Sequence, residues 1–174
     1  MDPKIDLCKR AQKGDKKAFG DLYALYAKEL YRYAYFVLGS PESAADAVQD
    51  AVISAFEQIK NLRKPEAFKA WIFKILSNTC NKYISEKIRQ RNTLVYDDGL
   101  GGLAFLSAVP AEDIMDLKQA FTVLDPVQRQ IVLLCVVEGY KSREVAQMIS
   151  STPGTVRSKL ARALKKMREE LEKS

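Results

Sequence analysis

The sequence contains no histidine, and its three cysteines (Cys8, Cys80 and Cys135) lie far apart. Without histidine the chain cannot build a Ser-His-Asp or Cys-His catalytic group, and it lacks the most common zinc ligand. Three unclustered cysteines in apolar, periodic segments predict buried, reduced thiols instead of a disulfide or metal framework. No paired acid-base residues and no phosphate-binding glycine loop stand out. We therefore expect a protein that is not an enzyme and that holds no metal or cofactor.

The sequence also lacks a long apolar run. No segment approaches the roughly 18 apolar residues of a membrane-spanning helix. The first ten residues, MDPKIDLCKR, lack the apolar stretch of a signal peptide. We expect a soluble, cytoplasmic protein that is not embedded in a membrane.

The charged residues are collected in blocks, although the net charge is only +6. Residues 40–59 carry four acidic residues and no Lys or Arg, whereas residues 60–91 carry nine basic residues against two acidic ones. Residues 92–126 are acidic again, and residues 141–168 carry eight basic residues against one acidic residue. Two basic blocks separated by acidic ones indicate two nucleic-acid contacts and at least one partner of a different kind.

Apolar residues recur at spacings of three and four through most of the chain, which predicts an all-α fold. Breaks in this pattern divide it into two small helical bundles, residues 1–91 and 113–174, joined by a flexible linker over residues 92–112 that contains three glycines and Pro110. In the first bundle we expect a helix over 4–13, a single helix from an Asp15 cap to Gly39, and a helix that starts at Ser40-Pro41.

The helix after Pro41 has two different faces. One face is predicted to be buried and the other carries Asp46, Gln49 and Asp50; the buried positions are Val48, Val52, Ala55, Phe56 and Ile59. The next helix places Trp71 on an apolar stripe, so we expect this tryptophan in the core instead of on a base-stacking surface. In the second bundle Asp125 and Gln128 form a predicted capping box at a helix whose core positions are Ile131, Leu134, Cys135 and Val136.

Residues 139–167 have the pattern of a helix-turn-helix. A short helix from Gly139 to Ile149 is followed by a turn at Ser150–Thr152 and by a longer helix with Pro153 at its start. The buried stripe of the second helix is predicted to be Val156, Leu160, Leu164 and Met167, and its exposed face carries Arg157, Ser158, Lys159, Arg162, Lys165 and Lys166. Such a helix enters the major groove of DNA, where arginine pairs with guanine, while Ser142 and Thr155 at helix N-termini suit phosphates. The alternative is a surface helix whose lysines only provide solubility.

Four motifs together resemble a family. Their order and spacing are similar to those of bacterial sigma factors of the extracytoplasmic-function group, which consist of sigma regions 2 and 4, and the resemblance covers roughly residues 15–91 and 113–171. The motifs are Ala18-Phe19…Leu22-Tyr23…Tyr26, Ala45-Asp46-Ala47-Val48-Gln49-Asp50…Phe56, Phe68-Lys69-Ala70-Trp71-Ile72…Ile75…Asn78 and Gly154-Thr155-Val156-Arg157-Ser158-Lys159-Leu160. Ala45 and Val52 depart from the family pattern, as does Lys141, where a capping Ser or Thr is usual and Ser142 is expected to take that role.

The resemblance implies a role for each charged block. Asp46, Gln49 and Asp50 would bind the β′ clamp helices of core RNA polymerase. Leu62 and Arg63, with Lys74, Asn78 and Lys82, would hold the opened minus-10 strand and a flipped base. Ser142, Thr155, Arg157, Ser158, Lys159 and Arg162 would read the minus-35 element of promoter DNA. The second bundle would also contact the β flap, and the linker with Asp97 and Asp98 would thread the RNA exit channel.

The family resemblance also implies control by an anti-sigma factor that masks both DNA-binding bundles. Two other functions remain open from the sequence. An autonomous helix-turn-helix regulator would bind palindromic DNA without polymerase, and a sigma-like adaptor would bind a protein partner but no promoter. Neither alternative uses the acidic-then-basic arrangement of residues 40–91 together with the basic helix near the C-terminus.

Overall fold

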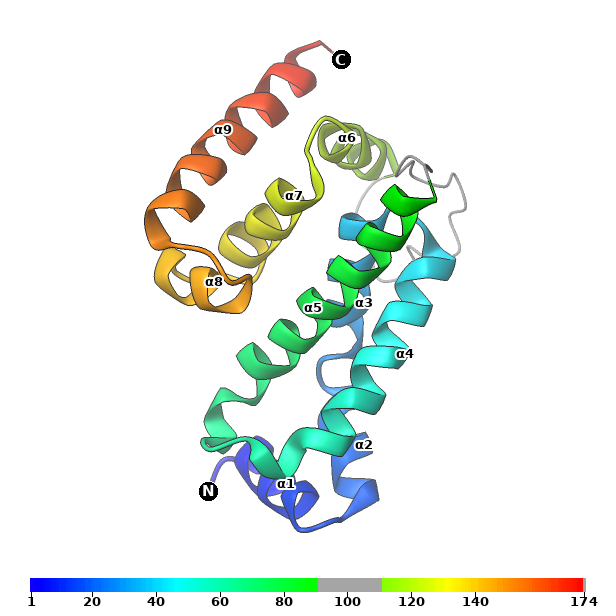
Figure 1. Ribbon diagram of the computed structural model, residues 1–174, viewed down its shortest axis with the longest axis vertical. Helices are drawn as coiled ribbons and strands as arrows, with labels where there is room; N and C mark the ends of the chain where they lie inside the picture. Colours follow the sequence, from blue (N-terminus) through cyan, green and yellow to red (C-terminus); the bar gives the residue numbers. More distant parts are fainter. Residues whose placement is uncertain (91–110, 174) are drawn as a thin grey trace.

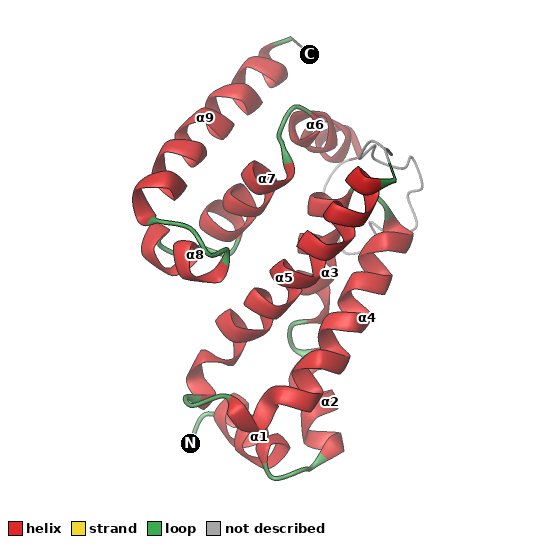
Figure 2. Cartoon of the chain, viewed as in Figure 1, coloured by secondary structure: helices red, strands yellow, loops and turns green. Residues whose placement is uncertain are grey.

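The computed structural model describes residues 1–90 and 111–173, and in this part of the chain the regular elements are all helices or helical turns (Figure 2). The predicted all-α fold class with two helical bundles is confirmed. The linker predicted over residues 92–112, with Asp97 and Asp98, lies almost entirely outside the described residues. The helix that follows it already includes residues 111 and 112.

The elements follow one another as two bundles (Figure 1). The first contains α1 (Pro3–Gln12), α2 (Lys16–Ala24), α3 (Ala27–Leu38), α4 (Pro41–Gln58) and α5 (Phe68–Arg89), with the 3-10 turns η1 (Ile59–Asn61) and η2 (Pro65–Ala67) between the last two. The second contains α6 (Ala111–Thr122), α7 (Pro126–Val132), the π-helical turn η4 (Leu133–Val137), α8 (Ser142–Met148) and α9 (Pro153–Glu172).

Most helices start where the sequence supplies a capping side chain. The Asp15 carboxylate accepts the Ala18 N–H at 3.0 Å and starts α2, and the Ser40 hydroxyl accepts the Ser43 N–H at 3.3 Å at the start of α4. At α7 the Asp125 carboxylate accepts from the Gln128 N–H at 2.8 Å, while the Gln128 side chain accepts from the Asp125 N–H at 3.1 Å. These caps satisfy N–H groups that have no partner inside the helix, so the predicted starts are confirmed.

The single helix predicted from Asp15 to Gly39 is wrong, because the chain breaks at Leu25-Tyr26 into α2 and α3. Neither glycine nor proline marks this break. The Tyr26 ring is buried, with its centroid 5.8 Å from that of Phe68, and the Lys4 ammonium lies 5.4 Å from the tyrosine centroid. Packing against α5 and α1 thus outweighs the local preference for a continuous helix.

Outside the helix-turn-helix, two predicted core positions are exposed. Phe56 keeps 39% of its surface accessible although its ring lies 5.2 Å from that of Phe19. Val136 is 56% exposed, because the helix that begins at Pro126 widens into the π-helical turn η4 before it ends at Val137, and this turn changes which side chains face the core. The thiols of Cys8 and Cys80 are buried as predicted, whereas Cys135 is half-buried.

The two bundles pack against each other. Helix α7 contacts α3 and helix α8 contacts α5, so the second bundle lies along one side of the first (Figure 1). Phe36 of α3 and Phe121 of α6 meet with ring centroids 4.9 Å apart. The sequence did not predict this contact between bundles, and it determines what surrounds the candidate site.

Candidate nucleic-acid interface

Helices α8 and α9 form the predicted helix-turn-helix. The turn between them passes through Ser150, which has a left-handed φ of 56°, and the Thr152 hydroxyl then accepts the Thr155 N–H at 3.2 Å to start α9. Pro153 occupies the first turn of α9, where its missing N–H has no cost. The turn and the cap fix the direction in which α9 leaves α8.

The buried line of α9 differs from the predicted one at a single position. Val156 and Ala163 are buried and Leu160 and Met167 are packed against the core, but Leu164 is 38% exposed. The inward positions are therefore spaced by four, three and four residues, which is the helical repeat. Because these positions face inward, the basic side chains of α9 lie on its outer face.

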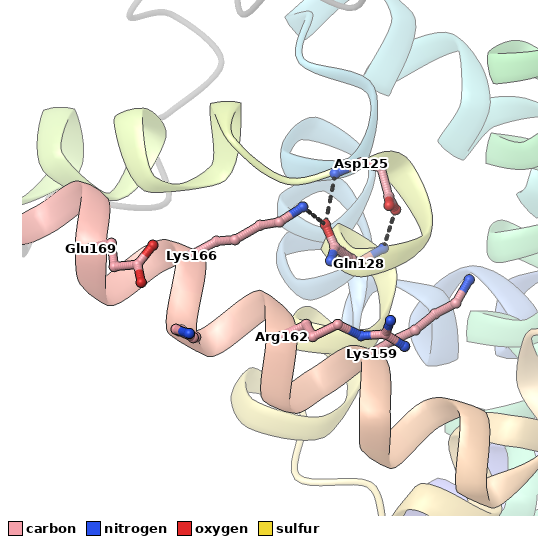
Figure 3. Close-up of a pocket in the computed structure, with 7 residues that line it drawn as sticks. Asp125, Gln128, Lys159, Arg162, Lys166 and Glu169 are labelled. Carbon is pink, nitrogen blue, oxygen red and sulfur yellow. Dashed lines mark hydrogen bonds between the residues drawn. The ribbon is translucent and has the colours of Figure 1, made fainter.

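The outer face of α9 carries a continuous group of cations. Arg157 and Arg162 are exposed, and Ser158 is exposed between them. The Arg162 guanidinium donates to the Ser158 carbonyl and hydroxyl oxygens, both at 3.3 Å. A groove of about 450 Å³ lies between α9 and the start of α7 (Figure 3). It is lined by Asp125, Gln128, Lys159, Arg162, Lys165, Lys166 and Glu169.

The predicted phosphate contacts at helix starts are less accessible than expected. The expectation that Ser142 caps α8 is wrong, because Ser142 is already the first residue of the helix; its side chain is half-buried. Lys141 occupies the capping position, and its N–H donates to the Glu144 carboxylate at 3.1 Å. The Thr155 hydroxyl, also half-buried, is bonded to the Thr152 hydroxyl at 2.8 Å.

Helix α5 carries three of the residues predicted to hold a DNA strand. Lys74, Asn78 and Lys82 are exposed at intervals of four residues, so they follow one side of the helix. Arg63 is exposed in the loop before α5, but Leu62 is only 8% exposed and belongs to the hydrophobic core. Trp71 is half-buried and packs against the core, with its ring 5.9 Å from that of Phe68.

Helix α4 presents the predicted acidic face. Asp46, Gln49 and Asp50 are exposed, and Ile53 lies among them with 51% of its surface accessible. The Tyr83 hydroxyl of α5 donates to the Asp50 carboxylate at 2.6 Å. Burial and this neighbouring carboxylate raise the pKa of Tyr83. Ile53 was not predicted as part of this face, although its spacing of four and three residues from Gln49 and Asp50 places it there.

The arrangement of the bundles brings α5, which was assigned to the minus-10 strand, next to α8 and α9, which were assigned to the minus-35 element. Lys74 and Trp71 of α5 line a groove of about 340 Å³ together with Glu144 and Gln147 of α8. A second groove, of about 480 Å³, is lined by Asn81 and Ser85 of α5 and by Lys159 of α9, among others. Neither groove was predicted, because both depend on how the bundles pack.

The described residues include no helix that is long and apolar enough to cross a membrane. They include no group of three or more His, Cys, Asp or Glu side chains placed to hold a metal ion. The geometry thus defines a helical protein that contains a helix-turn-helix with a cationic outer face, which is a class of DNA-binding protein.

Comparison with known proteins gives the family. The sequence profile of sigma-70 region 2 matches residues 22–90, and that of sigma-70 region 4 matches residues 114–167. The RNA polymerase sigma factor SigV of Bacillus subtilis (strain 168) is 30% identical over 150 residues, which span 85% of this chain and 87% of the relative. The extracytoplasmic-function (ECF) RNA polymerase sigma factor SigW of the same organism is 24% identical over 179 residues and 94% of each chain.

Two solved structures share the fold. One is CnrH in complex with the cytosolic domain of CnrY, with a TM-score of 0.72, 22% identity and 99% coverage of both chains. The other is the sigma factor RpoE in complex with the anti-sigma factor NepR from Bartonella quintana, with a TM-score of 0.77, 22% identity and coverage of 90% of this chain and 98% of that one. The chain belongs to the extracytoplasmic-function group of the sigma-70 family. It is therefore a transcription initiation factor that directs RNA polymerase to promoters, and it is not an enzyme.

Proposed function

We propose that this sigma factor acts through three separate faces, with residues 1–91 as the polymerase-binding and minus-10 unit, 92–112 as the linker and 113–174 as the minus-35 unit. The observation that carries the proposal is that α4, α5 and α9 expose faces of different charge. The face of α4 is acidic, and those of α5 and α9 are basic. The chemistry of each face suits a different partner.

The outer face of α9 is assigned to the minus-35 element. Arg157 and Arg162 present guanidinium groups that match the O6 and N7 acceptors of guanine in the major groove. Ser158 and Lys159 add hydrogen-bond donors beside them, and Ser142 and Thr155 lie at the starts of α8 and α9, where helix N-termini would suit the flanking phosphates. Since phosphates position the protein and base edges specify the sequence, the two arginines are the candidates for base selection.

Helix α5 and the loop before it are assigned to the opened minus-10 strand. Asn78 offers both a donor and an acceptor to the edge of an unstacked base. Lys74 and Lys82 lie one turn away on either side and would bind the strand backbone, with Arg63 at the loop. The buried Leu62 side chain would shape the wall of the base pocket and not project into it.

The exposed face of α4 is assigned to the β′ clamp helices of core RNA polymerase. Asp46, Gln49 and Asp50 surround the exposed Ile53, so the face combines an apolar centre with a charged rim. This combination is typical of protein interfaces, in which the rim charges set partner choice. The second bundle would in turn contact the β flap, which holds α9 at its DNA element.

The proposal places the protein in the cytoplasm, under the control of an anti-sigma factor. The two solved structures with this fold are complexes, CnrH with the cytosolic domain of CnrY and RpoE with the anti-sigma factor NepR. A partner that covers the basic faces of α5 and α9 would block both DNA contacts at once. Each bundle alone should bind DNA weakly, because affinity arises from two linked contacts and the polymerase.

Reconstituted transcription tests the proposal. The chain is added to core RNA polymerase on a promoter library randomised at both elements, and specific transcripts are expected only when the chain and core are both present. Asp46→Lys should lower core affinity by roughly tenfold or more, because it reverses the charge of one residue in the rim of the proposed interface. Glu172→Lys, an equal charge change at an exposed position near the end of α9, is the matched control.

Two results would contradict the proposed function. Tight binding to a palindromic duplex without polymerase would indicate an autonomous regulator. Binding of a protein partner with no transcript from any library member would indicate an adaptor.

A further inference from the structure

Glu138 of the second bundle is inserted into the first bundle as a buried carboxylate. Its side chain is only 4% exposed, and its Oε1 lies 2.7 Å from Arg32 Nη2 of α3. The other oxygen, Oε2, lies 3.2 Å from Lys69 Nζ of α5. The same ammonium lies 3.3 Å from the Glu29 carboxylate. One carboxylate therefore bridges two cations of the opposite bundle.

The local backbone is shaped to deliver this side chain. The π-helical turn η4 ends directly before Glu138, whose N–H donates to the Leu133 carbonyl at 2.9 Å. Gly139 then adopts a left-handed φ of 78° and turns the chain toward α8. π-Helical turns are rare and are found preferentially at functional positions. Here the turn aims Glu138 at the first bundle and leaves Val136 and Val137 exposed.

Polar side chains of α7 make two more contacts across the same interface. Arg129 is buried, and its guanidinium donates to the Val37 carbonyl at 3.3 Å and to the Phe121 carbonyl at 3.0 Å. Val37 is in the last turn of α3, where carbonyls lack helical partners and attract cations. The buried Gln130 amide donates to the Asn81 side-chain oxygen of α5 at 2.8 Å.

The interface therefore combines apolar and polar contacts. The Phe36–Phe121 ring pair is apolar, while Lys118 of α6 lies over the Tyr35 ring of α3 at 5.9 Å from its centroid. Interfaces between domains that hold ion pairs and hydrogen bonds resemble transient protein–protein contacts. Water can solvate Glu138, Arg129 and Gln130 when the bundles separate, so this interface suits reversible closure.

In the closed arrangement the second bundle contacts the face of α5 that the proposed function assigns to DNA. Lys74, Asn78 and Asn81 are spaced by four and three residues and share one face of the helix. Asn81 is bonded to the second bundle, and Lys74 lines a groove with Glu144 of α8. A DNA strand along this face would meet α8 and its carboxylate.

We propose that the Glu138–Arg32–Lys69 cluster is an autoinhibitory latch that holds the bundles closed and withholds α5 from the DNA strand until they separate. The inhibitory role rests on the proposed function of α5, whereas the closure itself does not. Breaking the latch leaves Arg32 and Lys69 without their shared carboxylate, and separation lets water solvate them. If only a fraction of the chains is open, the apparent dissociation constant for the target equals the constant of the open form divided by that fraction. A chain that is mostly closed therefore binds more weakly.

Small-angle X-ray scattering and the fluorescence of Trp71, the only tryptophan, test the closure on the full chain. Trp71 lines the groove between α5 and α8 and should respond when the bundles separate. Glu138→Gln is expected to increase the radius of gyration and to shift the Trp71 emission to longer wavelength. Glu172→Gln removes the same charge from an exposed position of α9 and should leave both unchanged.

Variants that exchange the signs of the latch charges distinguish an opened latch from a misfolded chain. Glu138→Lys should open the bundles while circular dichroism reports unchanged helix content. Adding Arg32→Glu and Lys69→Gln should close them again, because the ion pair is restored with opposite signs. Equal radii of gyration for the wild type and Glu138→Gln, or no closure by the reversed pair, would overturn the latch.

The inhibitory role is read from transcription with core polymerase. Glu138→Gln is expected to lower the chain concentration for half-maximal transcription by about threefold or more. An open variant with an unchanged half-maximal concentration would overturn the inhibition. If no variant supports promoter-specific transcription, the proposed function fails, while the scattering by itself still decides whether the latch exists.

Discussion

At the scale of single residues, two arginines on the exposed face of α9 are the candidates for reading DNA bases. Arg162 donates to two oxygens of Ser158 one turn earlier, so part of its guanidinium is already oriented before DNA arrives. Arg157 is exposed at the start of the same helix. Orientation in advance lowers the entropy lost on binding, which favours Arg162 over a flexible lysine as a reader of base edges, and Arg157 presents the same planar guanidinium group.

Replacement of either arginine by alanine tests this assignment. We expect Arg157→Ala and Arg162→Ala each to weaken binding of the polymerase complex to a minus-35 duplex by about 1–3 kcal/mol and to relax selectivity at one base pair. Fluorescence anisotropy with single-base variants of the duplex measures both effects. Arg168→Ala, at an exposed position of the same helix further from the turn, is the control. An equal loss on every duplex sequence would show that the arginines only contact phosphate.

At the scale of elements, the helix ends hold the first bundle in shape. Asp15 caps α2 through the Ala18 N–H and also accepts from Arg10 of α1 at 2.8 Å, so one carboxylate ties two helices together. The hydrogen bond from Ala18 and that from Arg10 lower the pKa of Asp15 below its ordinary value. The folded state therefore favours the ionised form of this side chain.

This pKa shift predicts how stability depends on acid. Because the folded-state pKa is lowered, the contribution of Asp15 is present above the ordinary aspartate pKa of 3.8 and is lost as the pH falls below it. Asp15→Asn should lower the melting temperature at pH 6, and the difference from the wild type should shrink toward pH 3. Asp21→Asn, in the exposed middle of α2, is the control. A difference that stays constant with pH would contradict the assignment.

At the scale of the whole molecule, contact between the bundles couples their stabilities. Phe121 is 1% exposed, and its ring packs on Phe36 of the other bundle. In the closed arrangement this ring pair couples the two bundles, so unfolding of the wild type should be one transition. Charge adds to this coupling through Glu138 and Arg129, whose partners lie on α3 and α5.

Truncation of the shared ring should uncouple the bundles. Phe121→Ala is expected to cost about 3–5 kcal/mol, mainly in the second bundle. Urea unfolding followed by Trp71 fluorescence and by circular dichroism should coincide in the wild type and separate in the variant, with the dichroism signal changing first. Phe19→Ala, which removes a ring inside the first bundle, should instead lower the Trp71 transition. Coincident transitions in Phe121→Ala would show that the bundles remain one unit without the ring.

Much of the fold follows from local patterns in the sequence. The caps at Asp15, Ser40 and Asp125 act over three residues, and the helix-turn-helix is specified by the turn, Thr152 and Pro153. The charged faces of α4 and α9 follow from helical periodicity, since side chains three or four residues apart share a face. The assignment of those faces to DNA and polymerase stays a prediction.

Three features of the fold depend on contacts between residues that are distant in the sequence: the break between α2 and α3, the π-helical turn and the position of Glu138. Packing of Tyr26 on Phe68 breaks the helix predicted from Asp15 to Gly39, and the π-helical turn exposes Val136 and turns Glu138 toward Arg32. No local pattern fixes these features, because each depends on a partner more than forty residues away or on how the bundles meet. The sequence alone determined most helix starts, the exposed charges of α4 and α9 and the family, since these depend on residue types and short spacings. The closed arrangement, which covers part of α5, was decided only by the tertiary structure.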